Sequence, residues 1–114
     1  MKLTLNRTEE QTGIFKKSTV YYLHVNLEAT PDEMALVKKH QFDSMPFCES
    51  MFLASRPIDF DAGYFVGKPQ RLGFRSLQEL AHAESQIIEN AKKLKQQLET
   101  ASSYTSGGPR EIAL

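Results

Sequence analysis

The sequence contains little that would support a disulfide-linked, metal-bound or membrane-bound structure. Only one of its 114 residues is a cysteine, Cys48, so the chain alone cannot form an internal disulfide or a cysteine-based zinc cluster. No window approaches the roughly 18 consecutive apolar residues of a membrane-spanning helix. The first residues alternate apolar and polar types and lack the apolar core of a signal peptide. These absences predict a protein of a reducing compartment, and we expect it in the cytoplasm.

The sequence also lacks an excess of charge of either sign. Fourteen basic and fourteen acidic residues cancel, and such a chain produces no overall field that attracts nucleic acid or anionic lipid. We therefore expect no membrane contact, and nucleic acid only at a local patch. With 40% hydrophobic and 25% charged residues, the composition is that of an ordinary globular protein. The length predicts one domain, residues 1–101, followed by a polar tail, residues 102–114, that we expect to be flexible.

Two stretches near the start of the chain have the pattern of β-strands. Leu3 and Leu5 alternate with polar residues, which predicts a short strand with one face in the core. Residues 19–29 are rich in β-branched and aromatic types, which favour a second strand. Because the polar residues 7–13 separate the two stretches, we expect an antiparallel hairpin. The alternation places Tyr21, Leu23, Val25 and Leu27 on the core face and Tyr22, His24 and Asn26 on the opposite face.

The middle of the chain contains signals for one helix and several short strands. The segment 30–33 combines an N-cap threonine, a proline at the first helical position and a capping-box glutamate, which predicts a helix from Pro31 to about His40. The apolar residues 51–54 predict a short strand. Residues 64–67 and 71–75 predict a second hairpin, joined around a proline-containing turn.

A long amphipathic helix is predicted after Ser76. Ser76 and Glu79 match a capping box, and a helical pattern follows to about Ala101. Seven of eight positions of a seven-residue repeat are apolar, with Glu84 as the exception. A helix of about 25 residues is roughly 37 Å long, which exceeds what strands of four to six residues would cover. The apolar stripe can simply face the core, or its surplus can contact another protein through Ile87, Leu94 and Leu98.

Together these elements predict the fold class. The order strand, strand, helix, three strands, helix indicates an α+β domain. We expect an antiparallel sheet of four to five short strands, helices packed on one face, and a long C-terminal helix.

The residues that most often perform catalysis do not form a recognisable constellation. Cys48 is followed by Glu49, whose charge disfavours a reactive thiolate. The three histidines, His24, His40 and His82, fall on different predicted elements and lack metal-binding spacing. Asp59 and Asp61 are separated by a single residue, but no further oxygen ligands of a calcium loop accompany them. We expect no cofactor, no metal site and no catalytic activity, and an enzyme built from this acid pair and a histidine is a third-ranked alternative.

A second functional alternative uses the face of the predicted sheet. Tyr22, Phe65, Arg71 and Arg75 would supply aromatic rings and positive charge, the groups on which several domains stack single-stranded nucleic acid. No RNP-type consensus accompanies them. No stretch of the chain is specific enough to indicate a family. The leading expectation is a small non-enzymatic interaction or regulatory protein that binds a partner protein, or itself as a homodimer, through its C-terminal helix or open sheet face.

Overall fold

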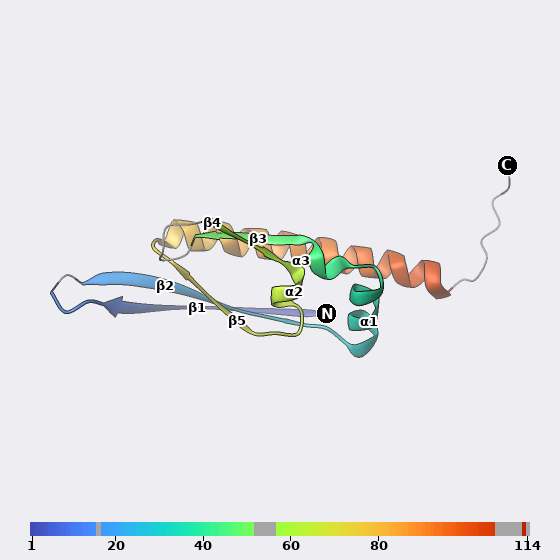
Figure 1. Cartoon of the computed structure of the whole chain (residues 1–114), viewed down its shortest axis with the longest axis horizontal. Coiled ribbons are helices and arrows are strands. Elements are labelled where there is room, and N and C mark those ends of the chain that lie inside the picture. Colours follow the sequence, from blue (N-terminus) through green and yellow to red (C-terminus); the bar gives the residue numbers. More distant parts are fainter. Residues whose placement is uncertain (16, 52–56, 107–112, 114) are drawn as a thin grey trace.

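A computed structural model describes residues 1–15, 17–51, 57–106 and 113 of the chain (Figure 1). The chain is α+β with a long C-terminal helix, as predicted. Its elements are β1 (Lys2–Thr12), β2 (Ser18–Glu28), α1 (Pro31–Lys39), the 3₁₀ turn η1 (Phe42–Ser44), β3 (Pro46–Met51), β4 (Pro57–Asp61), α2 (Ala62–Phe65), β5 (Gln70–Phe74) and α3 (Leu77–Ser106). The strands divide between two antiparallel sheets rather than joining in one: β1-β2-β5 and β3-β4.

The first hairpin is longer than the sequence pattern predicts. Every residue of β1 has a partner in β2, from Lys2 opposite Glu28 to Thr12 opposite Ser18. The polar stretch 7–13, expected to be a connection, is therefore mostly strand. Cross-strand backbone hydrogen bonds do not depend on apolar side chains, so a polar segment extends the ladder once the apolar half has fixed its register. Gly13 begins the turn with a φ of 103°, a conformation that glycine adopts without strain.

The partner of β5 differs from the prediction. β5 pairs with β2, with Tyr21 opposite Phe74 and Val25 opposite Gln70, and not with residues 64–67. The strand predicted there is wrong, because Ala62–Phe65 forms a helical turn. In that turn Ala62 and Phe65, three positions apart, both point inward and are fully buried.

The second sheet contains only β3 and β4, which pair antiparallel with an irregularity between Pro46 and Cys48. The strand predicted over residues 51–54 overlaps β3 only at Met51, and the rest of that segment lies outside the described residues. The side-chain amide of Asn90 in α3 donates a 2.6 Å hydrogen bond to the backbone carbonyl of Phe47. This bond ties β3 to the long helix.

The first helix begins and ends close to its predicted bounds. The hydroxyl of Thr30 accepts a hydrogen bond from the backbone N–H of Glu33, and the Glu33 carboxylate accepts one from the backbone N–H of Thr30, so the capping box is complete. The ammonium group of Met1 also binds the Glu33 carboxylate, at 2.9 Å. Burial alone would raise the pKa of Glu33, but these hydrogen bonds and the ammonium charge outweigh it and lower the pKa.

The long helix is continuous from Leu77 to Ser106 and spans about 45 Å. It extends five residues beyond the predicted end at Ala101, and its first turn is capped by the Ser76 hydroxyl, which accepts from the backbone N–H of Glu79. The buried stripe runs through Leu80, Ala83, Ile87, Ala91, Leu94, Leu98 and Ala101. Ala83 therefore takes the place that the repeat assigned to Glu84, and the stripe is not interrupted.

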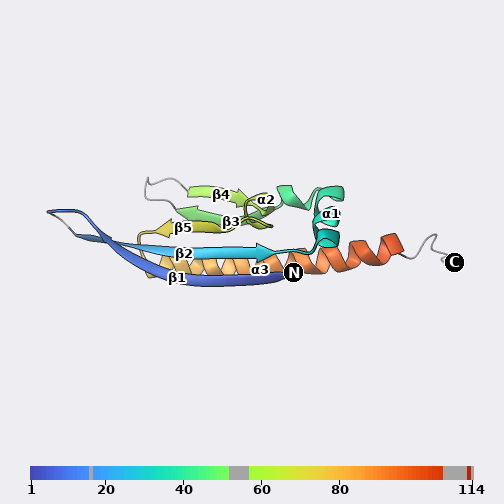
Figure 2. The same ribbon diagram turned by 90° about the horizontal axis from the view of Figure 1, so that it is seen from below.

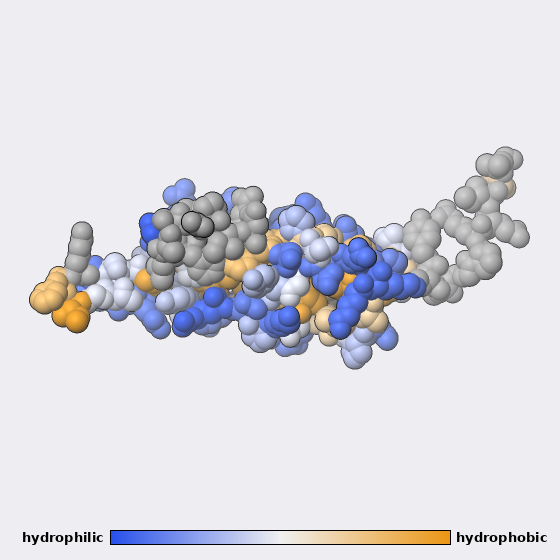
Figure 3. Space-filling view, in the orientation of Figure 1, coloured by the Kyte–Doolittle hydropathy of each residue, from blue (hydrophilic) through white to orange (hydrophobic). Residues whose placement is uncertain are grey.

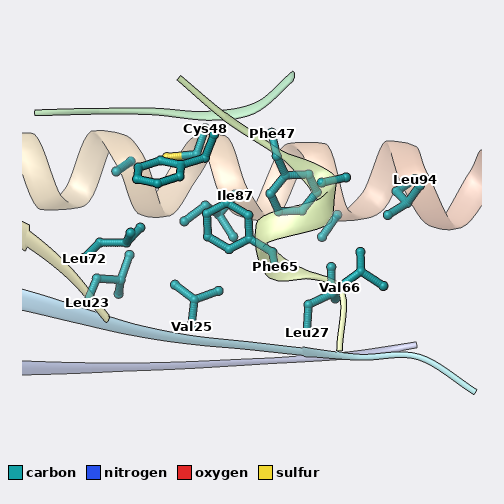
Figure 4. Packing of buried hydrophobic residues seen from close by; sticks show 14 of the residues in the cluster. Leu23, Val25, Leu27, Phe47, Cys48, Phe65, Val66, Leu72, Ile87 and Leu94 are labelled. Atoms are coloured by element: carbon teal, nitrogen blue, oxygen red, sulfur yellow. The ribbon is translucent and has the colours of Figure 1, made fainter. Parts of the chain in front are cut away.

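Two layers enclose the core. The sheet β1-β2-β5 forms one layer, and α3 with the β3-β4 pair lies over one face of it as the second (Figures 1 and 2). Inside, Phe65 packs against Phe47 and Phe60, with ring centroids 5.0 and 5.9 Å away. Figure 4 shows Phe65 in the space between α3, which contributes Ile87, and β2, which contributes Leu23, Val25 and Leu27.

Candidate functional site

The apolar stripe of α3 is completed within a single chain. The residues predicted as a protein interface, Ile87, Leu94 and Leu98, are all buried by the chain's own elements. α3 packs against β3, α1 and the three-stranded sheet. Its apolar stripe is therefore buried by more elements than the four- to six-residue strands that the sequence predicts. Among the side chains that the structure describes, the stripe therefore has no exposed apolar surplus, and the physical reason for expecting association through it is removed.

The exposed apolar surface lies elsewhere, at the turn of the first hairpin. Four large hydrophobic residues of the described chain are exposed: Ile14 at 91%, Phe15 at 101%, Leu77 at 52% and Tyr64 at 50%. The two most exposed are neighbours in the turn, which we call the arm tip and define as residues Gly13–Phe15. Figure 1 shows the hairpin projecting beyond α3 and the β3-β4 pair, and Figure 3 shows apolar surface at its end.

Most of the hairpin behind the tip is exposed to solvent, although Val20 of β2 is buried. β5 pairs with β2 only from Tyr21 to Val25, so residues 18–20 of β2 have a strand on one side alone. On β1, the polar residues 9–12 are all exposed. Because each strand residue adds about 3.3 Å, the two strand pairs beyond Val20 carry the tip roughly 7 Å outward. Residues 7–12 of β1 and their partners in β2, residues 18–23, together form the arm.

An ion pair fixes the base of the arm to the body. The Arg7 guanidinium donates two hydrogen bonds to the Glu84 carboxylate on α3, at 2.9 and 2.8 Å. Hydrogen bonding to Arg7 lowers the pKa of Glu84; burial acts in the opposite direction, and the positive charge of Arg7 adds to the lowering. The same bond raises the pKa of Arg7. A two-pronged contact of this kind fixes orientation as well as distance, so the arm leaves the body in a defined direction.

The outer face of the three-stranded sheet brings together part of the predicted nucleic-acid set. The Arg71 guanidinium lies over the Tyr22 ring, 4.5 Å from its centroid. Tyr22 is opposite Gly73, where an added Cβ would lie 3.4 Å from the ring's Cε1 atom, so the ring lies close over the β5 backbone. Beside this stack, the Thr8 hydroxyl and the His24 ring are 2.8 Å apart. The face also has a shallow cavity of about 260 Å³.

The other two residues of that set are placed differently. Phe65 is fully buried between Phe47 and Phe60, so it cannot stack on a base. Arg75 is exposed and directly follows the last residue of β5. The predicted platform therefore loses Phe65, and its described stack is that of Arg71 on Tyr22.

The candidate catalytic groups are dispersed. Cys48 is buried on β3. The three histidines occupy β2, the C-cap of α1 and α3, and the His40 ring stacks on Phe42 at 5.5 Å. Asp61 is exposed at the N-cap of α2, and the side chain of Asp59 lies outside the described residues. Among the side chains that the structure describes, no three histidine, cysteine or acidic groups gather where they could hold a metal ion.

The described surface also has open grooves. One, of about 620 Å³, lies between α3 and the segment after α1, and is lined by His40, Phe42, Lys93, Gln96, Gln97, Thr100 and Ala101. A second, of about 480 Å³, lies beside β3 and includes Cys48, Asp61 and Asn90. Within the described part of the chain, no helix combines the length and apolar character needed to span a bilayer.

Sequence reasoning passed over the arm tip. Its signal is a pair of large apolar residues, Ile14 and Phe15, directly after a glycine in a turn that otherwise favours polar types. Comparison with known proteins finds no matching family model, curated protein or solved structure. The chemistry of the chain's own surface is therefore the basis for a functional proposal.

Proposed function

We propose that the chain is a non-enzymatic interaction protein that binds a partner protein by inserting Ile14 and Phe15 into an apolar pocket. The observation that carries the proposal is the almost complete exposure of both side chains at the end of a projecting arm. Exposed apolar residues scattered singly are normal on a protein surface. Two neighbours at the turn of a projecting hairpin form a compact anchor instead.

The available energy suits a specific contact. Removing an isoleucine or a phenylalanine side chain from water contributes about 1.5–3 kcal/mol each, so the pair offers roughly 3–6 kcal/mol, or about two to four powers of ten in affinity. Since neither side chain is packed against the body, moving them into a pocket costs the fold no contacts. The ion pair between Arg7 and Glu84 orients the arm beforehand, which lowers the entropy lost on binding.

The charges beside the arm tip are of both signs. Lys16 and Lys17 follow Phe15 in the sequence, and Glu9 and Glu10 are exposed on β1, about 10–13 Å behind the turn by strand geometry. These four charges cancel, so the tip carries no net positive charge of the kind that draws a protein segment to anionic headgroups.

The test compares tagged chains expressed in their source cells. Ile14→Ser combined with Phe15→Ser should reduce a specific co-purifying protein at least tenfold. Leu77→Ser, a matched loss of an exposed apolar residue on the body, should leave that protein in place. Equal loss in both variants, or no loss in either, contradicts the proposal. If the chain instead floats with anionic vesicles, and the Ile14→Ser/Phe15→Ser variant does not, the partner of the arm tip is a lipid surface and not a protein.

A second candidate function rests on the stack of Arg71 on Tyr22. An open sheet face with an aromatic ring and a guanidinium can hold the bases of a single strand. This function predicts salt-sensitive binding of a single-stranded oligonucleotide that weakens on Arg71→Ala more than on Arg75→Ala, because only Arg71 lies over the ring. Absence of binding at low salt removes this candidate.

A further inference from the structure

The outer edge of β1 is the longest unpaired strand edge in the described part of the chain. β1 lies at one side of the sheet order β1-β2-β5, and its eleven residues pair with β2 alone in a register without a bulge. Figure 2 shows it along the border of the sheet, with no strand on its far side. Such an edge presents backbone N–H and C=O groups at every second residue, which can pair with another strand.

The flank of this edge is apolar and incompletely covered. A groove of about 220 Å³ lies between β1 and α3, lined by Met1, Leu3, Leu27, Ile88, Ala91, Lys92 and Lys95. Leu3 and Leu5 of β1 are only partly buried, as is Ile88 of α3. Burial of this flank would complete the core where the sheet ends, whereas the stripe of α3 that faces β3 is already complete.

The charges of β1 indicate which strand fits beside it. Lys2 is near one end, and Glu9 and Glu10 are near the other. Antiparallel pairing of two copies of β1, centred on Asn6, places Lys2 of each copy opposite Glu10 of the other. Parallel pairing would instead place like charges together. Lys2 and Glu10 are exposed on the same outer face of the strand, and opposite charges in directly facing positions stabilise a strand pair.

The helices agree with this arrangement. A twofold axis through the sheet places the two α3 helices antiparallel on one face, about 10 Å apart if each lies over its own β1 and β2. Ile88, which lines the groove beside β1, lies on the side of each helix that faces the axis.

We propose that two copies of the chain pair through β1 to form a closed dimer with a continuous six-stranded sheet. This dimer is independent of the arm-tip contact: it uses the edge of the sheet and leaves Ile14 and Phe15 outside. A twofold contact of this kind is self-complementary and removes the exposed edge from both copies. The expected species is one symmetric dimer rather than a filament.

Charge reversal tests the proposal by sedimentation equilibrium. Lys2→Glu and Glu10→Lys should each weaken the dimer at least tenfold, because each change turns two attractive pairs into two repulsive ones. The double variant Lys2→Glu/Glu10→Lys restores the pairs and should recover most of the affinity. Lys68→Glu, an exposed charge in the turn before β5, is the control and should have no effect.

An engineered thiol gives a second, geometric test. Asn6→Cys should form a disulfide-linked dimer under mild oxidation, since the two residues face each other across the axis at a spacing that a disulfide can bridge. Asn26→Cys, on the same face of the central strand β2, should not. A chain that is monomeric at all concentrations overturns the proposal. A dimer whose dissociation constant is unchanged by the charge reversals overturns it as well. The arm-tip variants should dimerise like the unmodified chain, which separates this test from that of the proposed function.

Discussion

Replacement of Leu94 by alanine should destabilise the individual chain, because the apolar stripe of α3 is buried within it. Leu94 is fully buried, and its neighbours along the stripe, Ala91 and Leu98, are buried as well. Leucine-to-alanine changes at such positions cost about 2–5 kcal/mol, through lost burial and the cavity left behind. A chain of 114 residues has roughly 6–17 kcal/mol of stability in total, so the loss is a large share.

Urea unfolding followed by circular dichroism measures this loss. Lys95→Ala is the matched control, because Lys95 is the next residue of the same helix, is exposed, and has a helix propensity close to that of alanine. It should change the free energy of unfolding by less than about 0.5 kcal/mol. If Leu94→Ala costs less than about 1 kcal/mol, or lowers the assembled mass while the chain keeps its stability, the stripe serves an intermolecular contact and the reasoning is wrong.

Three further changes have defined outcomes. Ile14→Ser with Phe15→Ser should change the free energy of unfolding by less than about 0.5 kcal/mol, because the tip contributes no packing. Thr30→Ala should cost about 1 kcal/mol in the same assay by removing the cap of α1. The folded state lowers the pKa of Glu84, so its stabilising contribution is present above the unfolded pKa and is lost as the pH falls through the folded value. Glu84→Gln should therefore flatten the decline in stability below about pH 5, and an unchanged acid profile would show that the bond to Arg7 contributes nothing.

The sequence predicts the parts of this fold that depend on local chemistry. Thr30 and Ser76 mark the starts of α1 and α3 through side-chain hydrogen bonds made within three residues, so no tertiary information is needed. The apolar stripe of α3 follows from helical periodicity. The predicted stripe is wrong at one position. A strict seven-residue repeat selects Glu84, whereas a straight helix with 3.6 residues per turn buries Ala83.

The parts that the sequence does not predict depend on partners far along the chain. Residues 62–66 are compatible with a strand or a helical turn, and burial of Phe65 among rings from β3 and β4 selects the turn. β5 pairs with β2, nearly fifty residues away, rather than with its neighbour in sequence. The polar half of β1 becomes a strand through its backbone ladder with β2 and through polar side-chain contacts such as that of Arg7 with Glu84. In each case the deciding interaction is invisible to a local pattern.

In the candidate site, too, the sequence predicts what depends on local chemistry and misses what depends on distant parts of the chain. The alternation in β2 correctly places Tyr22 on the outer face, and Arg71 joins it there. The predicted nucleic-acid face is wrong at Phe65. The helical turn α2 directs this side chain into the core, and a local sequence pattern does not show that. The arm tip was missed since its importance comes from exposure, and exposure depends on how far the hairpin extends beyond the body.

Site-specific crosslinking from position 15 tests the central claim most directly. A photoreactive phenylalanine analogue in place of Phe15 keeps the ring at the tip, and the same analogue at Tyr64, an exposed aromatic position on the body, is the control. In source cells, the account predicts a discrete adduct with another protein from position 15 that is absent from position 64. Equal or absent adducts at both positions would contradict the claim that the arm tip is the docking element.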